Sequence, residues 1–260
     1  MVATARSLPL LSRLALGLRR TGAWPVIMAV IALLVSLPVL TVLSQIFVPA
    51  PEIWSHLAST VLPRYLLNTA GLTLGVAVGV LVIGVGTAWL VVMCRFPGQR
   101  WFEWALLLPL AVPTYVIAYA YTDFFQFAGP LQSFLRETFG WGAGDYWFPP
   151  IRSLGGAIAL LTLVLYPYVY LLTRAAFLEQ SVCVLEVGRT LGRGPWRLFA
   201  TVAVPLARPA IAGGAALALM ETLNEFGAVQ FFAVDTFTAG IYRTWFGLGE
   251  RTAAAQLAGV

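Results

Sequence analysis

The sequence predicts an all-α protein that folds as a polytopic bundle of transmembrane helices, and two observations carry this prediction. First, 60% of the 260 residues are hydrophobic, only 10% are charged, and the mean hydropathy is +0.84. Soluble domains carry about 25% charged residues, so a water-soluble fold could not cover this much apolar surface. Second, uncharged segments of about 20 residues, the length that crosses a bilayer, recur along the chain.

Five segments are predicted to span the membrane as helices. They cover residues 24–48, 65–94, 104–122, 153–173 and 209–232. The apolar residues 253–260 are too few to cross a bilayer, and they are predicted to begin a sixth span. We therefore expect a single transmembrane domain over residues 1–260, with a polar loop at 174–208.

The first span could be mistaken for a cleaved signal peptide. Arg19 and Arg20 precede it, and Val48-Pro49-Ala50 could pass for a cleavage site. However, the apolar run of 25 residues is longer than the apolar core of a signal peptide, which has 7–15 residues, and Pro51 follows at once. We expect a retained helix.

All sixteen cationic residues are arginines, and their distribution predicts the orientation. With the N-terminus in the cytoplasm, eleven of them fall on the cytoplasmic side and five on the outer side. The loop at 174–208 is then cytoplasmic. Nucleic-acid binding is not expected from the net charge of +5, because no basic patch with interleaved aromatic residues is present.

The residue types needed for several other functions are scarce. Cys94 and Cys183 are both predicted on the cytoplasmic side, where free thiols are expected, and His56 is the only histidine. No zinc motif, Ser/His/Asp set or phosphate-binding GxxxxGK[ST] loop occurs. We expect neither an enzyme nor a bound cofactor, and any ATP hydrolysis must come from a partner.

Two further patterns concern packing and the membrane surface. Gly71, Gly75 and Gly79 are four residues apart, which predicts a close helix crossing on one face of the second span. The segment 123–152 is rich in aromatic residues. It is interpreted as an aromatic belt at the bilayer interface or as a docking surface for an external partner, and the two are compatible.

The polar loop is predicted to form two helices joined by a turn. Residues 175–191 show helical periodicity, and Gly192 is expected to end that helix. Gly194 and Pro195 restart the chain into a second short helix over 196–204, followed by the next span. From physics alone, this loop is either an amphipathic connector resting on lipid headgroups or a surface for a partner.

The same loop resembles the cytoplasmic loop of ABC importer permeases. In that family, Glu-Ala-Ala is followed after three residues by Gly and after nine more by Ile-x-Leu-Pro. The matching residues here are Glu186, Val187, Gly188, Gly192, Val202, Val204 and Pro205. Val187 and Gly188 replace the two alanines, and glycine within a helix costs about 1 kcal/mol relative to alanine.

Further segments resemble permeases of the ferric-iron type. They cover residues 190–197, 205–209, 220–227 and 235–243. Proteins of that type usually carry two bundles of about six helices in one chain. The resemblance covers only the first bundle, so a second half or a homologous permease chain is expected as a partner.

The resemblance implies a permease subunit of an ATP-driven importer in a bacterial inner membrane. Its implied partners are ABC ATPase subunits, which would seat the Glu186 helix, and a periplasmic iron-binding protein. Substrate alternatives in the same class are thiamine, sulfate, polyamine and sugar. An ion-coupled secondary carrier or channel is a further alternative, although no clear inverted repeat supports it.

Polar residues at the end of the fifth span are candidates for the substrate path. Glu221 and Glu225 are one helical turn apart and are predicted to share a face, with Asn224 beside them. Carboxylates at membrane depth usually face a cavity or a partner, and their hard oxygens suit a ferric ion. The alternative is that they lie wetted near the outer helix end or pair with Arg243. No metal ligand is firmly assigned.

Overall fold

A computed structural model describes residues 23–49, 51–142, 144–180, 188, 190, 192 and 194–259 of the chain. The described residues form helices and contain no strand, which confirms the all-α prediction. Four helices are long and apolar enough to cross a membrane, and a bent pair of helices could provide a fifth span.

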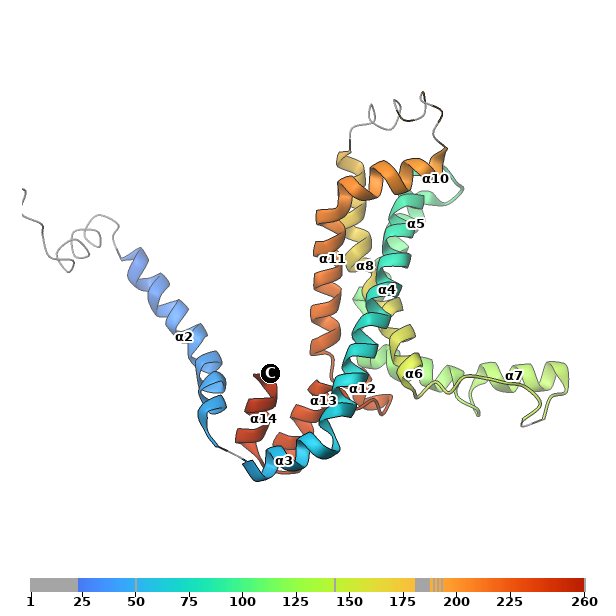
Figure 1. The fold of residues 1–260 in the computed structure, drawn as a ribbon. Coiled ribbons are helices and arrows are strands. Elements are labelled where there is room, and N and C mark those ends of the chain that lie inside the picture. The colour runs from blue at the N-terminus through green and yellow to red at the C-terminus, as the bar shows by residue number, and fades with distance from the viewer. Residues whose placement is uncertain are drawn as a thin grey trace, which may run out of the picture.

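The first helix stands apart from the rest of the bundle (Figure 1). This helix, α2 (Trp24–Ser44), carries no charge and contains Pro38, and none of its residues is buried. It continues through the short helix η1 (Gln45–Phe47) toward α3 (Pro51–Thr60). Gln256 anchors this end, because its Nε2 donates to the carbonyl oxygens of Gln45 (2.9 Å) and Val48 (2.6 Å).

Three long helices form the core: α4 (Leu62–Met93), α8 (Leu154–Glu179) and α11 (Val204–Asn224). The close crossing predicted from the second span is confirmed, and its partner is α8. A Cβ atom added at Gly75 would lie 2.7 Å from Ile158, and one added at Gly79 would lie 2.5 Å from Thr162. The backbones of α4 and α8 therefore pack directly against each other.

Val169 of α8 joins all three core helices. It is fully buried, and a Cβ added at Gly84 of α4 would lie 2.7 Å from its Cβ. A Cβ added at Gly214 of α11 would lie 2.7 Å from its Cα. Larger residues at either glycine would push two of the three helices apart.

The third span predicted at 104–122 is not one continuous helix. The chain instead forms α5 (Gln99–Ala105), η2 (Leu108–Ala111), α6 (Thr114–Phe125) and α7 (Pro130–Phe139), with a bend of 98° between the first two and the last two. Proline explains the break. Val112 is extended because it precedes Pro113, and a residue before proline is disfavoured in the helical region.

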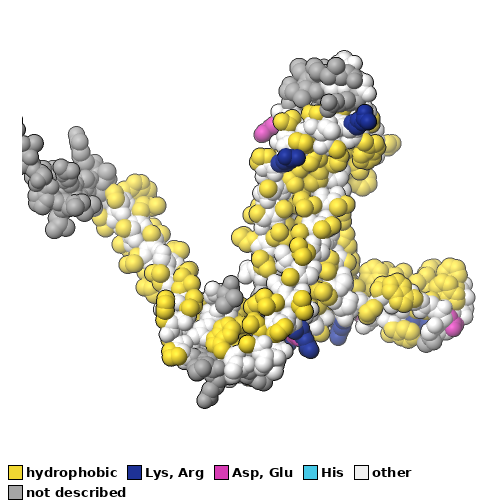
Figure 2. Space-filling model, in the orientation of Figure 1, with side chains coloured by type: hydrophobic (Ala, Val, Ile, Leu, Met, Phe, Trp, Pro, Cys, Tyr) yellow, Lys and Arg dark blue, Asp and Glu magenta, His cyan; other side chains and the backbone are white. Residues whose placement is uncertain are grey.

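The α6–α7 arm, residues 114–139, projects sideways from the bundle (Figure 1). Apolar side chains dominate its visible face and that of α2 (Figure 2). The predicted aromatic segment, residues 123–152, thus covers the end of α6, all of α7 and the chain that returns to α8.

The fifth span also differs from its predicted bounds of 209–232. Helical structure begins earlier, with α10 (Pro195–Leu198) and the π-helix η3 (Phe199–Ala203), and α11 ends at Asn224. Four short helices follow: α12 (Gly227–Phe231), α13 (Phe237–Tyr242), η4 (Arg243–Gly247) and α14 (Arg251–Ala258). The span ends early because Glu225 is extended, with ψ 123°.

The helices α4 and α8 run parallel, because Gly71, Gly75 and Gly79 meet Leu154, Ile158 and Thr162 in the same order, and α11 runs in the opposite direction. The bundle therefore has two distinct ends (Figure 1). The helix α10 lies at one end, and α3, α12 and α13 gather at the other. The arginine distribution predicts that the α10 end is cytoplasmic, and we call the other end the outer end on that prediction. The helix α14 lies beside α3, α13 and α2, where residues 253–257 are buried, and its role as the start of a sixth span stays a prediction.

Candidate functional site

The polar loop contains a bend that we call the elbow, residues 194–205. It comprises α10, the π-helix η3 and the first turn of α11, and it lies across the ends of α4 and α8 (Figure 1). The predicted second helix at 196–204 is present, but it continues into α11 instead of ending before it. Pro205 falls in the first turn of α11, where its missing N–H is tolerated.

The predicted first helix at 175–191 differs from the structure at its start. Its first residues belong to α8, which continues without a break to Glu179. Gln180 is then extended, with ψ 131°, so no continuous helix covers 175–191. Glu186 and Val187, two of the residues predicted to couple to an ATPase, lie outside the described residues.

Aromatic rings fasten the elbow to the core. Trp89 of α4 lies 5.0 Å from Phe199 of η3, between ring centroids, and 5.8 Å from Phe177 of α8. Phe177 is 1% exposed and Trp89 is 8% exposed. One buried indole therefore contacts both the elbow and the end of α8.

A hydrogen bond adds a second fastening. The Nε2 of Gln180 donates to the carbonyl oxygen of Ala203 at 2.9 Å, which joins the end of α8 to the π-helix. Ala203 is fully buried, so this bond lies in the interior of the protein. Nothing in the sequence distinguishes Gln180, because a glutamine next to an apolar helix carries no specific signal.

The structure explains why glycine occupies two positions of the loop. Gly188 is buried, and a Cβ at this position would collide with the side chain of Leu198, itself 2% exposed. Gly192 has φ +77°, a conformation that glycine adopts without strain, as expected for a residue that ends a helix. The absence of a side chain at Gly188 therefore leaves space for Leu198 of the elbow. This packing offsets the cost of placing glycine, a poor helix former, at that position.

The outward side of the elbow offers an unpaired apolar surface. Trp196 is 73% exposed at the polar end of the bundle, and Arg197 beside it is also exposed. Val202, Val204 and Pro205 of the predicted motif are half-buried. Basic side chains are visible at this end in Figure 2. An exposed indole next to a cation is typical of a protein–protein interface.

An ion pair braces α5 against α8 near the elbow. Arg174 Nη2 lies 3.2 Å from Glu103 Oε2, and both side chains are less than one-third exposed. The hydroxyl of Tyr170 donates to the carbonyl oxygen of the same Glu103 at 3.2 Å. These contacts fix the start of the broken third span relative to α8.

Of the three candidate residues for the substrate path, Glu221 and Asn224 lie three residues apart in α11, whereas Glu225 follows the helix in an extended conformation. Glu221 is half-buried and lies seven residues after Gly214, on the side of α11 that packs on α8. Asn224 is exposed. Glu225 lies beyond the helix, and its Oε1 accepts a hydrogen bond from the backbone N–H of Ala228 at 2.8 Å. The predicted shared face is wrong because α11 ends between the two glutamates.

Arg243 pairs with a different carboxylate from the one considered in the sequence. Its Nη2 lies 2.8 Å from Asp235 Oδ1, and Arg64 Nη1 lies 3.7 Å from Asp235 Oδ2. The hydrogen bond that the Arg243 guanidinium donates to the Asp235 carboxylate raises the pKa of Arg243. In the described part of the chain, neither Glu221 nor Glu225 forms an ion pair with Arg243.

The loop that carries Asp235 is tied to α4. Asn68 Nδ2 donates to the carbonyl oxygen of Asp235 at 3.0 Å, and the N–H of Phe237 donates to Thr69 Oγ1 at 3.0 Å. Among the described residues, no three His, Cys, Asp or Glu side chains lie close enough together to hold a metal ion.

A family profile matches a large part of the chain. Residues 80–245 match the binding-protein-dependent transport system inner membrane component. The match includes the core helices from the second half of α4 onward, the elbow and the outer carboxylates.

Three curated proteins are similar to this chain. The molybdenum transport system permease protein ModB of Escherichia coli (strain K12) is 33% identical over 152 residues, which are 58% of this chain and 63% of that protein. The putative 2-aminoethylphosphonate transport system permease protein PhnU of Salmonella choleraesuis (strain SC-B67) is 30% identical over 74% of this chain and 68% of that protein. The Fe(3+)-transport system permease protein FbpB 2 of Haemophilus influenzae is 29% identical over 75% of this chain but only 34% of that protein.

A solved structure shares the fold. The crystal structure of a bacterial ABC transporter involved in the import of the acidic polysaccharide alginate superimposes with a TM-score of 0.73 over 95% of this chain and 92% of its own chain, at 15% identity. At that identity the likeness concerns the fold alone.

Proposed function

This chain belongs to the family of binding-protein-dependent transport system inner membrane components, and we propose that it is the membrane-spanning permease subunit of an ATP-driven ABC importer. With four helices long enough to span, or five with the bent pair, it is a multi-pass protein of the inner membrane. The chain spans 63% of the length of its relative ModB, so the activity of the complete importer is part of the proposal.

The observation that carries the proposal is the exposed elbow fastened to the core. Its inner side is fixed by Trp89 and Gln180, whereas Trp196 on its outer side is 73% exposed. A rigid element with one packed face and one open face can transmit the movement of a partner into the bundle. The partner that we propose is a pair of ABC ATPase subunits, seated on the elbow and on the segment around Glu186.

Further proposed partners are a periplasmic binding protein at the outer end and a second permease chain. One solved relative of the same fold is described as a complex with an alginate pentasaccharide-bound periplasmic protein. The second permease would be another copy of this chain or a homologous chain. No cofactor is proposed for this chain, and ATP would be used by the ATPase subunits.

For the substrate, the sequence resemblance implies ferric iron, and FbpB 2 supports this proposal. A second candidate is a small oxyanion, because ModB and PhnU, named for molybdenum and 2-aminoethylphosphonate transport, cover larger shares of their own length. Of the two glutamates, we propose the half-buried Glu221 for the substrate path. Glu225 instead has a structural contact, because its Oε1 accepts a hydrogen bond from the backbone N–H of Ala228.

Uptake measurements separate the two candidates. Cells carrying the chain with its neighbouring transport genes should accumulate radioactive ferric iron or radioactive molybdate, and deletion of the chain should abolish the uptake of one only. For the importer role itself, Glu186→Ala should reduce association with the ATPase subunit without preventing membrane insertion. An intact Glu186→Ala complex that transports at the normal rate would count against the assigned loop.

A further inference from the structure

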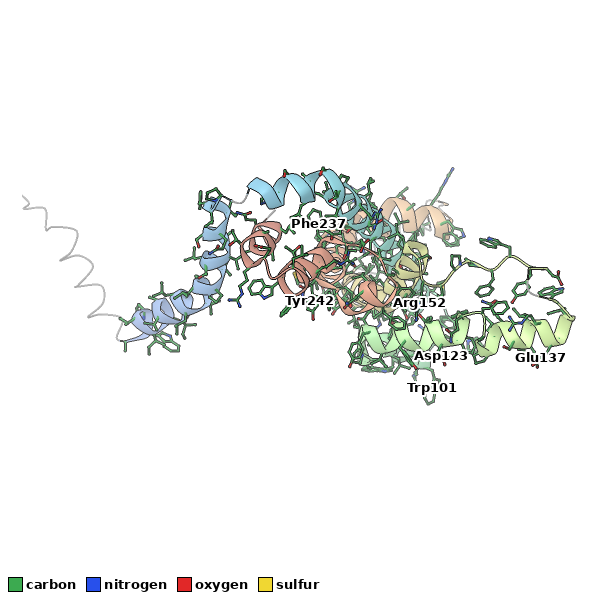
Figure 3. The ribbon with its side chains drawn as sticks, turned by 90° about the horizontal axis from the view of Figure 1, so that it is seen from below. Trp101, Asp123, Glu137, Arg152, Phe237 and Tyr242 are labelled. Atoms are coloured by element: carbon green, nitrogen blue, oxygen red, sulfur yellow. The ribbon has the colours of Figure 1, made fainter. Side chains whose placement is uncertain are left out.

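A pocket of about 670 Å³ lies between the α6–α7 arm and the segment 144–152 that returns to α8. The arm extends away from the bundle, with Asp123 and Glu137 along it and Arg152 close to the bundle (Figure 3). The volume falls within the range of about 300–1,000 Å³ that is usual for small-molecule sites. Most of the wall is apolar, and it includes Phe125, Phe127, Phe148, Pro149 and Pro150.

A hydrogen-bond network holds this pocket in shape. Gln132, only 6% exposed, donates to the carbonyl oxygen of Phe125 at 2.7 Å and accepts from the Tyr146 hydroxyl at 2.8 Å. Arg136 donates to the same Tyr146 hydroxyl at 3.0 Å and to Ser133 Oγ at 3.2 Å. The α7 wall and the returning segment are therefore joined, and the space between them is a built cavity.

Thr122 contributes a buried hydroxyl without a partner. This residue lines the pocket and is 3% exposed, and its Oγ1 has no hydrogen-bond partner among the described residues. Thr122 is not exceptional in this respect: the buried hydroxyls of Thr162 and Thr173 also have no partner among the described residues, whereas that of Thr222 donates to Ala218 at 2.8 Å. Thr122 is therefore treated as part of the pocket wall, and no hydrogen bond to a ligand is assigned to it.

Arg152 contributes a positive charge to the lining. Its guanidinium lies over the ring of Phe231, 4.9 Å from the centroid, and the residue is exposed. Arg152 takes part in none of the three ion pairs found among the described residues. Guanidinium groups with free N–H donors recognise phosphate oxygens strongly. The ligand should therefore be an anion with an apolar body.

We propose that this pocket binds an anionic phospholipid. Its acyl chain would lie along Phe125, Phe127 and Phe148, and its phosphate oxygens would accept hydrogen bonds from Arg152. The setting favours a lipid over a soluble anion, because Phe124, Phe127 and Phe134 of the arm are 46–62% exposed.

Native mass spectrometry of the detergent-purified chain tests the proposal, with added phosphatidylglycerol as the probe. We expect one retained phosphatidylglycerol per chain. Arg152→Gln should lower its affinity by about tenfold, the size of one charge-assisted hydrogen bond. Arg152→Lys should retain part of the affinity. The matched control Arg100→Gln alters an exposed arginine at the α10 end and should leave binding unchanged.

Three results would overturn the proposal. One is equal lipid occupancy in the wild type and in an Arg152→Gln variant that elutes as a folded species in size-exclusion chromatography. Another is displacement of the lipid by millimolar inorganic phosphate together with normal binding in Phe148→Ala, which would indicate a site for free anions. The third is displacement by ferric iron or molybdate with an altered KM for uptake in Arg152→Gln, which would indicate a substrate site.

Discussion

The indole of Trp89 in α4 lies 5.0 Å from the ring of Phe199 in the elbow, between centroids, with an interplanar angle of 58°. The same indole meets Phe177 of α8 edge-on at 5.8 Å. Three elements that are distant in the sequence thus share one aromatic contact. Since the elbow is packed against this indole, we expect a movement of the elbow to displace α4 and α8 as well.

Trp89→Ala should loosen the elbow. Replacing a buried aromatic residue with alanine costs about 3–5 kcal/mol in packed cores, so the thermal unfolding midpoint in detergent should fall by several degrees. Trp89→Phe should recover part of the loss. Trp101→Ala is the control, because that indole is 82% exposed, and an equal loss in both variants would contradict the role given to Trp89.

Gly188→Ala should destabilise the elbow although alanine is the better helix former by about 1 kcal/mol. The added Cβ would collide with the buried side chain of Leu198. Gly194→Ala is the control, because a Cβ there meets nothing within 4 Å. Limited proteolysis of the two variants measures the difference. If Gly188→Ala is as resistant as the wild type, the contact with Leu198 is unimportant.

Gly192→Pro should disrupt the turn before the elbow. Proline fixes φ near −65°, whereas Gly192 has φ +77°. Gly192→Asn should be tolerated better, since asparagine enters the left-handed region more readily than other non-glycine residues. Co-purification with the ATPase subunit should fall for the proline variant and persist for the asparagine variant. Equal retention of the ATPase in both would contradict this account of the turn.

Glu225→Gln should preserve uptake, because the amide oxygen can still accept the hydrogen bond from Ala228. Glu225→Ala removes that acceptor and should lower uptake by loosening α12. If Glu225→Gln abolishes uptake while the protein level is normal, the charge itself is required and the capping role is insufficient.

Glu221→Ala tests the substrate path separately. The half-buried carboxylate is expected to be needed for uptake but not for assembly with the ATPase. Met220→Ala is a suitable control, since that side chain is 64% exposed on the other side of α11. Wild-type uptake by a stable Glu221→Ala variant would refute a path role for this residue.

Gly79→Leu should separate α4 from α8. A Cβ at this position would already lie 2.5 Å from Thr162, whereas one at Gly86 of the same helix meets nothing within 4 Å. Leucine at Gly79 should therefore lower the yield of folded protein, and leucine at Gly86 should not. Fluorescence-detected size-exclusion chromatography gives the comparison directly.

The sequence predicted the spanning segments well where apolar runs are uninterrupted. The second and fourth spans appear as α4 and α8, and Gly71, Gly75 and Gly79 correctly predicted a close crossing. Hydropathy could not predict the break of the third span, because the break depends on Pro109 and Pro113 within an apolar run. Proline leaves hydropathy unaffected but removes a helical hydrogen bond.

The candidate site was predicted in part. Gly192 and the helix restart at Pro195 follow local rules of chain conformation, so they could be read from the sequence. The positions of Glu221 and Glu225 could not, because α11 ends at Asn224 although no glycine or proline stands at residues 224–226 to mark the end. Contacts such as Gln180 with Ala203 join residues 23 positions apart and leave no periodic signal.

Crosslinking at the elbow tests the central claim most directly. A chain with Cys94 and Cys183 replaced by serine and with Trp196→Cys would be expressed with the ATPase subunit encoded beside it and treated with a bifunctional thiol reagent. The account predicts a crosslink from position 196 to the ATPase and no labelling by a membrane-impermeant thiol reagent added to intact spheroplasts. Labelling from outside, without any crosslinked ATPase, would contradict it.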